Sequence, residues 1–162
     1  MELQRRSGIL LHPTSLPGAP GIGTIGQKAF DFVDWLVAGH QSLWQILPLG
    51  PTGYGDSPYA SFSTFAGNPL MIDLEDLVDR GWAEKKSIVP PEYISDKGNV
   101  DFGAVVWWKM PVLKDSATYF LKNANEKDLA AYKEFVAEHD FWLENYSLFM
   151  SIKEFYDKKA QE

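Results

Sequence analysis

The stretch Ser7-Gly-Ile-Leu-Leu-His-Pro13 opens the part of the chain that decides the fold. Its continuous apolar run is typical of a strand that is buried on both faces, as in a parallel sheet, and His12-Pro13 ends the run. A second run of the same kind, Ser42-Leu-Trp-Gln-Ile-Leu47, ends at Pro48. These two runs are therefore predicted to be strands.

The segment between the two strands predicts a loop followed by a helix. Residues 14–23 are rich in proline and glycine and are expected to be loop. Thr24 precedes Gln27 by three residues, which is the spacing of a capping box at a helix start, and Gly39 is placed to end the helix. Apolar residues share one face of this helix: Ala29, Phe32, Val33, Leu36 and Val37. Strand, loop, helix and strand in this order indicate an α/β fold with a parallel sheet.

The second half of the chain has a different character. Asp73 is placed to cap a short helix that stops at Gly81, and Asp101 to cap a helix through about Asn123 that Pro111 should kink. Two further stretches have apolar residues at helical spacing. We therefore divide the chain into residues 1–75, with the strands and loops, and residues 76–162, which are mainly helical.

Composition excludes several classes of protein. The chain has 162 residues, of which 45% are hydrophobic and 23% charged, and this is the composition of one globular unit. A net charge of −7 argues against nucleic-acid binding. The absence of cysteine removes disulfides and thiolate sites. No apolar run approaches the ~18 residues of a membrane span, and the N-terminal run is too short for a secretory signal. We expect a cytoplasmic protein with no membrane or nucleic-acid partner.

Several familiar motifs fail on their context. Gly21-Ile-Gly-Thr-Ile-Gly26 matches a dinucleotide fingerprint, but a proline-rich loop separates it from the first strand and no acidic residue ends the second. The three histidines lack metal-ligand spacing, so no metal site is expected. His12 ends a strand where ligands often bind, although a histidine hydrogen-bonded within its loop is the favoured interpretation. No serine has the context of a nucleophile elbow.

The loop Gly50-Pro-Thr-Gly-Tyr-Gly-Asp-Ser-Pro-Tyr59 follows the second strand and is the strongest candidate site. It combines two tyrosines and Asp56 with a glycine-rich backbone, and Ser61-Phe-Ser-Thr-Phe65 extends it. Aromatic rings that stack on C–H faces, beside groups that pair with hydroxyls, are what sugar binding needs. The alternative is a packed Ω-loop whose tyrosines cover its own core. The residues of the loop leave both interpretations open.

At this loop the chain resembles the 4-α-glucanotransferases of the amylomaltase type, in their N-terminal part. The resemblance covers nearly the whole chain. It rests on blocks that occur in order: Ser7-Gly-Ile-Leu-Leu-His-Pro-Thr-Ser-Leu-Pro17, Trp44-Gln-Ile-Leu-Pro-Leu-Gly-Pro-Thr-Gly53, Tyr54-Gly-Asp-Ser-Pro-Tyr59, Phe65-Ala-Gly-Asn-Pro-Leu70 with Ile72-Asp-Leu74, Val100-Asp-Phe-Gly-Ala104 and Trp142-Leu-Glu-Asn-Tyr146.

The resemblance implies a (β/α)8 barrel (TIM barrel) with helical insertions and a retaining double displacement. In that reaction a carboxylate attacks the sugar while a glutamic acid protonates the leaving oxygen, and the 4-hydroxyl of another glucan then opens the glucosyl-enzyme. It implies no metal and no organic cofactor. The partners implied are maltooligosaccharides and glucans of the starch or glycogen type.

The resemblance assigns binding residues but no catalytic residue to this chain. The family's catalytic carboxylates come from later barrel strands, and a bare barrel alone needs ~200 residues. Tyr59 resembles a tyrosine that lines the donor side of the active site, with Asp56 and Ser57 beside it. Tyr54 resembles an aromatic residue of the glucan-binding groove, which in some members belongs to a second site.

The resemblance also predicts an incomplete barrel: its first two strands and an inserted helical lobe. Aromatic residues that such an enzyme would cover with further chain are then expected to be exposed: Trp107, Trp108, Phe141 and Phe149. Each large side chain left unburied forgoes ~1.5–3 kcal/mol. We therefore expect a chain that is marginally stable alone, or that self-associates through the open edge of the barrel.

The leading hypothesis is an N-terminal portion of a 4-α-glucanotransferase that is inactive alone. A non-catalytic glucan-binding module using Tyr54 and Tyr59 is the alternative from another class. A structural domain with a degenerate cleft is a third interpretation. A plain glycoside hydrolase is the alternative among enzymes. Residues on the acceptor side decide whether water or a sugar hydroxyl attacks the glucosyl-enzyme.

Overall fold

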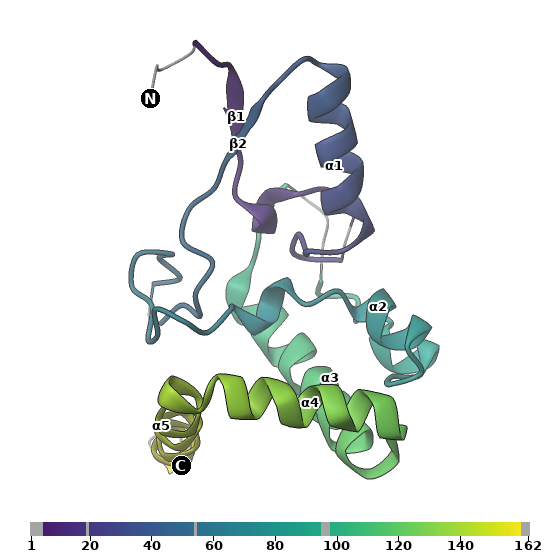
Figure 1. Cartoon of the computed structure of the whole chain (residues 1–162), viewed down its shortest axis with the longest axis vertical. Helices are drawn as coiled ribbons and strands as arrows, with labels where there is room; N and C mark the ends of the chain where they lie inside the picture. The colour runs from purple at the N-terminus through teal and green to yellow at the C-terminus, as the bar shows by residue number, and fades with distance from the viewer. Residues whose placement is uncertain (1–4, 19, 54, 95–97, 160–162) are drawn as a thin grey trace.

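The computed structural model describes residues 5–18, 20–53, 55–94 and 98–159. Strands β1 (Gly8–Leu10) and β2 (Leu43–Gln45) pair in parallel, with Ile9 opposite Trp44, and they lie side by side in Figure 1. The predicted strand–helix–strand unit is therefore confirmed. The described residues contain no third strand, so the sheet has two open edges.

Helix α1 (Gln27–Ala38) connects the strands, but its start differs from the prediction. Gly26, and not Thr24, is the N-cap, and no side chain caps the helix. The hydroxyl of Thr24 is buried and donates a hydrogen bond to Asp73 Oδ2 at 2.8 Å, which satisfies both groups away from water. The predicted capping box is therefore wrong, because a tertiary partner holds the threonine.

The strands are much more exposed than their apolar runs predicted. Only the middle residue of each strand, Ile9 or Trp44, is half-buried, whereas Leu10 and Leu43 face solvent. Trp44 packs edge-on against Phe32 of α1, with ring centroids 4.9 Å apart. The prediction of strands buried on both faces is wrong for this structure, because α1 covers part of one face and nothing described covers the other.

The core lies against helix α3 (Phe102–Asn123) and not against the sheet. One buried cluster joins Val105 to Ile22 and Leu70, and a second joins Trp108 to Leu74 and Ile88. These partners come from the loop before α1 and from three short elements: η2 (Pro69–Met71), α2 (Leu74–Asp79) and η3 (Lys85–Ile88). They lie beside α3 in the middle of Figure 1.

The four aromatic residues expected to be exposed do not behave alike. Trp107, Phe141 and Phe149 are exposed, as predicted. Trp108 is buried in the α3 core, so its prediction is wrong. The segment from α2 to η3 buries the Trp108 side chain, a role that the prediction gave to further chain.

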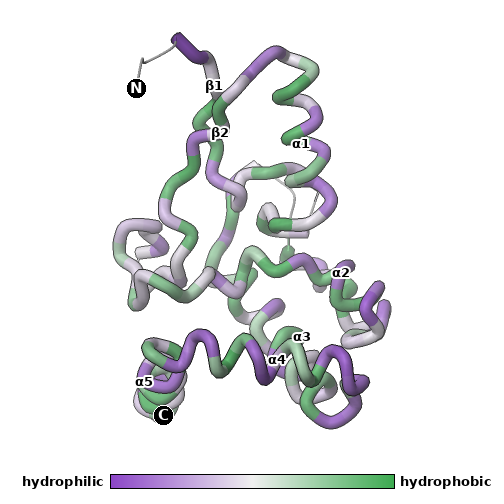
Figure 2. The backbone as a smooth tube through the Cα atoms, in the orientation of Figure 1, coloured by the Kyte–Doolittle hydropathy of each residue, from purple (hydrophilic) through white to green (hydrophobic). Residues whose placement is uncertain are grey.

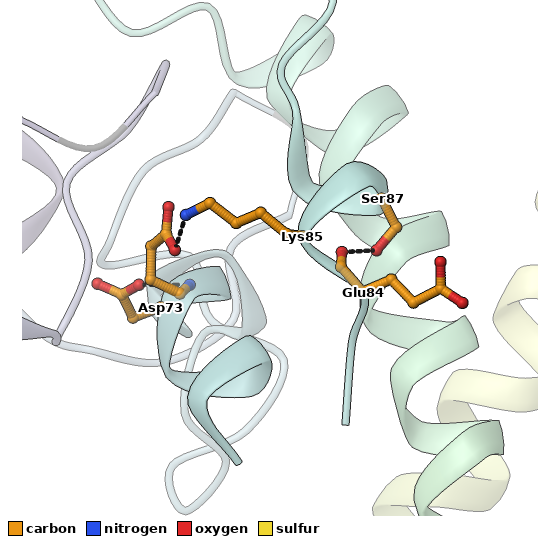
Figure 3. Close-up of polar contacts among 5 residues, drawn as sticks. Asp73, Glu84, Lys85 and Ser87 are labelled. Carbon is orange, nitrogen blue, oxygen red and sulfur yellow. Dashed lines mark hydrogen bonds and ion pairs between the residues drawn. The ribbon is translucent and has the colours of Figure 1, made fainter. Parts of the chain in front are cut away.

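The two predicted aspartate caps are confirmed. Asp73 accepts a hydrogen bond from the backbone N–H of Glu75 at 2.9 Å, and Asp101 accepts one from Ala104 at 3.0 Å. Figure 3 shows Asp73 at the start of α2, with Lys85 and Ser87 on the neighbouring turn η3. Lys85 forms an ion pair with Glu75, which links this turn to α2.

A buried lysine joins α3 to η2. Lys109 is only 2% exposed, and its Nζ donates a hydrogen bond to the carbonyl of Leu70 at 2.6 Å. Burial lowers the pKa of Lys109 to about 8, and the negative charge of Asp73 opposes this shift. The sequence alone did not single out this residue.

Helices α4 (Glu126–Glu138) and α5 (Asp140–Lys159) lie at the end of the molecule away from the strands (Figure 1). Both helices alternate hydrophilic and hydrophobic stretches along their length (Figure 2). Within the described ranges, no helix has the length together with the apolar character that crossing a bilayer requires.

Candidate functional site

The segment from Pro48 to Asn68, which we call the β2–η2 loop, follows the second strand and closes on itself. At its base the N–H of Asn68 donates to the carbonyl of Leu49 at 2.8 Å. Farther from this base, Thr52 and Ser61 form an antiparallel bridge. In Figure 1 the loop lies on the left, below the strands and above α5. The segment is therefore a folded unit with its own backbone hydrogen bonds.

Two backbone features fix the shape of the loop. A side chain at Gly50 would place its Cβ 2.3 Å from the hydroxyl of Ser61, so glycine allows the two sides of the loop to approach closely without displacing this serine. Asp56 has φ of +53°, in the left-handed region that aspartate tolerates better than most residues. The predicted site residue Asp56 thus lies in the turn at the tip, with its side chain exposed.

Tyr59 and Ser57, two of the predicted site residues, are joined by a hydrogen bond in the loop. The N–H of Tyr59 donates to the hydroxyl of Ser57 at 3.3 Å, while the tyrosine itself is 74% exposed. Tyr59 therefore does not cover a core of the loop, and the packed Ω-loop interpretation fails for this tyrosine. The other predicted tyrosine, Tyr54, lies outside the described residues.

Beside Tyr59 the loop surrounds a hollow of about 680 Å³, which we call the loop hollow. Its serine hydroxyls are engaged within the loop: Ser61 donates to the carbonyl of Ser63, and Ser63 accepts from the N–H of Phe65. Aromatic rings and the hydroxyl groups of serine and threonine thus line the hollow together. It is lined by Pro48, Leu49, Gly50, Pro58, Tyr59, Ser61, Phe62, Ser63, Thr64 and Phe65.

Helix α5 supports the loop hollow from a distant part of the chain. Phe149 lies 5.9 Å from Phe62 between ring centroids, and the Lys153 ammonium lies 5.4 Å from the centroid of the same ring. Helical spacing indicates only that apolar residues of α5 share one face of the helix, and it does not predict that Phe149 meets Phe62. Contacts between residues so far apart in the chain leave no signal in local periodicity.

His12 connects the ends of the two strands. Its Nε2–H donates to the carbonyl of Pro48 at 3.3 Å, and its Nδ1 lies 2.7 Å from the hydroxyl of Thr14. Both ring nitrogens are therefore engaged by neighbouring groups. The favoured interpretation, a histidine hydrogen-bonded within its loop, is confirmed.

Comparisons with known proteins show what this chain is similar to. Residues 11–162 match the family described as 4-alpha-glucanotransferase. The 4-alpha-glucanotransferase of Thermus thermophilus is 47% identical to this chain over 153 residues, which are 94% of this chain. That of Streptococcus pneumoniae serotype 4 is 45% identical over 157 residues, or 97% of the chain.

A solved structure matches both fold and sequence. The amylomaltase from Streptococcus agalactiae in complex with acarbose has a TM-score of 0.86 and 41% identity, over 95% of this chain. The chain spans about 30% of the length of each of these three proteins. A match over nearly all of its residues, in sequence and in structure, assigns this chain to the 4-α-glucanotransferase family.

Proposed function

We propose that this chain forms one wall of the glucan-binding cleft of a 4-α-glucanotransferase. The observation that carries the proposal is the exposed ring of Tyr59 at the edge of the loop hollow, in the loop that follows β2. In parallel α/β units, ligands bind outside the carboxyl ends of the strands, and this loop has that position. The amylomaltase relative in complex with acarbose supports a ligand related to oligosaccharides.

In this proposal β1 and β2 are the first two strands of a (β/α)8 barrel. Residues 1–75 carry the strands and the glucan-binding loop, and residues 76–162 form the inserted helical region. The two open edges of the sheet are consistent with further strands on either side. A cytoplasmic location stays a prediction from composition.

The proposed reaction moves an α-1,4-glucan segment to an acceptor glucan by a retaining double displacement. A carboxylate forms the glucosyl-enzyme while an acid protonates the departing oxygen, and the acceptor's 4-hydroxyl then displaces the carboxylate. We place these carboxylates outside the 162 residues. The role of this chain is to hold the donor sugar. Tyr59 stacks on the C–H face of the sugar, while Asp56 and Ser57 bind its hydroxyls. Tyr54 is proposed as a further ring of the groove.

The experiment is incubation of the chain with maltotriose, followed by separation of the products by size. We expect no products from the chain alone. We expect glucose and longer maltooligosaccharides once the rest of the sequence of the Thermus thermophilus relative is supplied as a second polypeptide. Transfer by the chain alone would contradict the placement of the carboxylates. Binding of maltooligosaccharides without any complementation would favour a non-catalytic binding module.

A matched pair of variants tests the role of Tyr59 in the complemented enzyme. Tyr59→Ala is expected to lower the transfer rate, because it removes the stacking surface for the donor. Tyr93→Ala removes a tyrosine of similar exposure that lies outside the loop, and it should leave the rate unchanged. Equal rates for the two variants would contradict the proposal.

A further inference from the structure

A second hollow lined by aromatic rings lies at the junction of α4 and α5. Its volume is about 450 Å³, and we call it the α4–α5 hollow. His139 is the C-cap of α4, where its N–H donates to the carbonyl of Phe135 at 3.0 Å, and α5 begins at the next residue. This change of direction places Phe141 and Trp142 of α5 around the same hollow as Phe135 of α4.

The rings around this hollow hold one another in place. Phe65 of the β2–η2 loop lies edge-on to Phe141 at 5.2 Å and stacked on Trp142 at 5.9 Å, between ring centroids. His139 lies edge-on to Phe135 at 4.4 Å. Although its ring is in contact with Phe65, Phe141 is 68% exposed. The hollow therefore offers positioned aromatic surface to a ligand.

The polar groups of the hollow favour a neutral, hydroxyl-rich ligand. The exposed carboxylate of Glu138 and the imidazole of His139 border the rings. Sugar hydroxyls donate to a carboxylate and pair with an imidazole, while pyranose C–H faces stack on rings. Anionic ligands are disfavoured, because the carboxylate lies at the site and the whole chain carries a net charge of −7.

Phe65 connects this hollow to the proposed cleft. The same side chain lines the loop hollow beside Tyr59 and the α4–α5 hollow beside Trp142. A linear polymer is the kind of ligand that can occupy two adjoining hollows at once. We propose that the α4–α5 hollow is a second binding site for the α-1,4-glucan, and that one chain passes over Phe65 from Tyr59 to Trp142. This inference rests on the proposed function.

The test is a titration of the 162-residue chain with maltoheptaose, followed by NMR. The indole N–H signal of Trp142, identified as the one that Trp142→Phe removes, reports on the α4–α5 hollow. The backbone amides of Tyr59 and Ser61 report on the loop hollow. We expect the signals of both hollows to shift with one dissociation constant. Maltotriose, being shorter, should bind with clearly lower affinity.

Variants separate binding from folding. Phe141→Ala and Glu138→Gln should each weaken maltoheptaose binding, with a loss of about ten-fold, or ~1.4 kcal/mol, for Phe141→Ala. Both should have much less effect on maltotriose binding at Tyr59. The control is Phe30→Ala, which removes a phenylalanine that is 64% exposed on α1 and lines neither hollow. Equal losses for Phe30→Ala and Phe141→Ala would overturn the inference.

The NMR signals distinguish failure of this inference from failure of the proposed function. If only Tyr59 and Ser61 shift, the α4–α5 hollow is not a glucan site and the proposed cleft stands. If only Trp142 shifts, the hollow binds glucan and the assignment of the cleft at Tyr59 fails. If no signal shifts at saturating maltoheptaose, both are overturned for this chain.

Discussion

Helix α3 and the strand pair differ in how many of their apolar side chains are buried. The buried clusters gather on α3, where Val105 and Trp108 meet the segments around η2 and α2. The strands are also rich in apolar residues, but only Ile9 and Trp44 are half-buried in them. Since the hydrophobic effect scales with the area removed from water, α3 is where folding free energy is gained. The exposed rings of the β2–η2 loop and of the α4–α5 hollow contribute little to this core, and they are the surfaces that we propose for ligands.

The largest expected effect comes from two adjacent tryptophans of α3. Trp108 is 8% exposed and Trp107 is 75% exposed, so they compare a core position with a surface position on one helix. Trp108→Ala should lower the free energy of unfolding by ~3–5 kcal/mol. Trp107→Ala should change it by less than about 0.5 kcal/mol. Urea unfolding measures both, and similar losses would show that the core is not centred on α3.

The next effect concerns pH and the buried Lys109. The folded-state pKa of Lys109 is about 8, below its ordinary value of 10.5. Between these two pH values the unfolded chain therefore binds more protons than the folded chain. Stability from this group is complete above about pH 10.5 and is lost as the pH falls through about 8; the difference is at most ~3 kcal/mol. Urea unfolding at about pH 7 and pH 10 tests this, with Lys109→Met as the control that should lack the rise. An equal rise in both proteins would mean that other groups cause it.

A smaller effect is expected from Tyr59, which tests the proposed binding surface and not the core. Tyr59→Ala should weaken maltooligosaccharide binding about ten-fold, or ~1.4 kcal/mol, because it removes an exposed stacking surface. It should leave the free energy of unfolding within about 0.5 kcal/mol. Titration calorimetry and urea unfolding together check the two halves of this expectation. A loss of stability comparable to that of Trp108→Ala would show that Tyr59 belongs to a core.

The smallest effect is expected at the open strand edges. Leu10 on β1 is exposed, and its replacement by lysine places a charge beside unpaired backbone groups, which disfavours pairing with a second copy. Leu10→Lys should weaken self-association by about 1 kcal/mol, or roughly five-fold, in sedimentation experiments. Val37→Lys on the exposed face of α1 is the matched control. Equal sedimentation of both variants and the parent chain would rule out association through this edge.

Local rules predicted the elements that depend on neighbouring residues. The runs ending at Pro13 and Pro48 became the parallel strands, because apolar runs and turn residues act within a few positions of the chain. Asp73 and Asp101 became N-caps for the same reason: each carboxylate bonds to an N–H two or three residues onward. The exposed Tyr59 also came from a local pattern, a glycine-rich loop with rings.

Only the tertiary structure decided how these elements are used. Thr24 had the spacing of a helix cap, yet it bonds to Asp73, 49 residues away. Lys109 looked like any helix charge, yet it is buried on the carbonyl of Leu70, 39 residues away. Phe65 joins the loop hollow to the α4–α5 hollow through contacts with Phe141 and Trp142. Sequence periodicity says which side of a helix is apolar, but what covers that side depends on distant segments whose contacts leave no mark in local sequence.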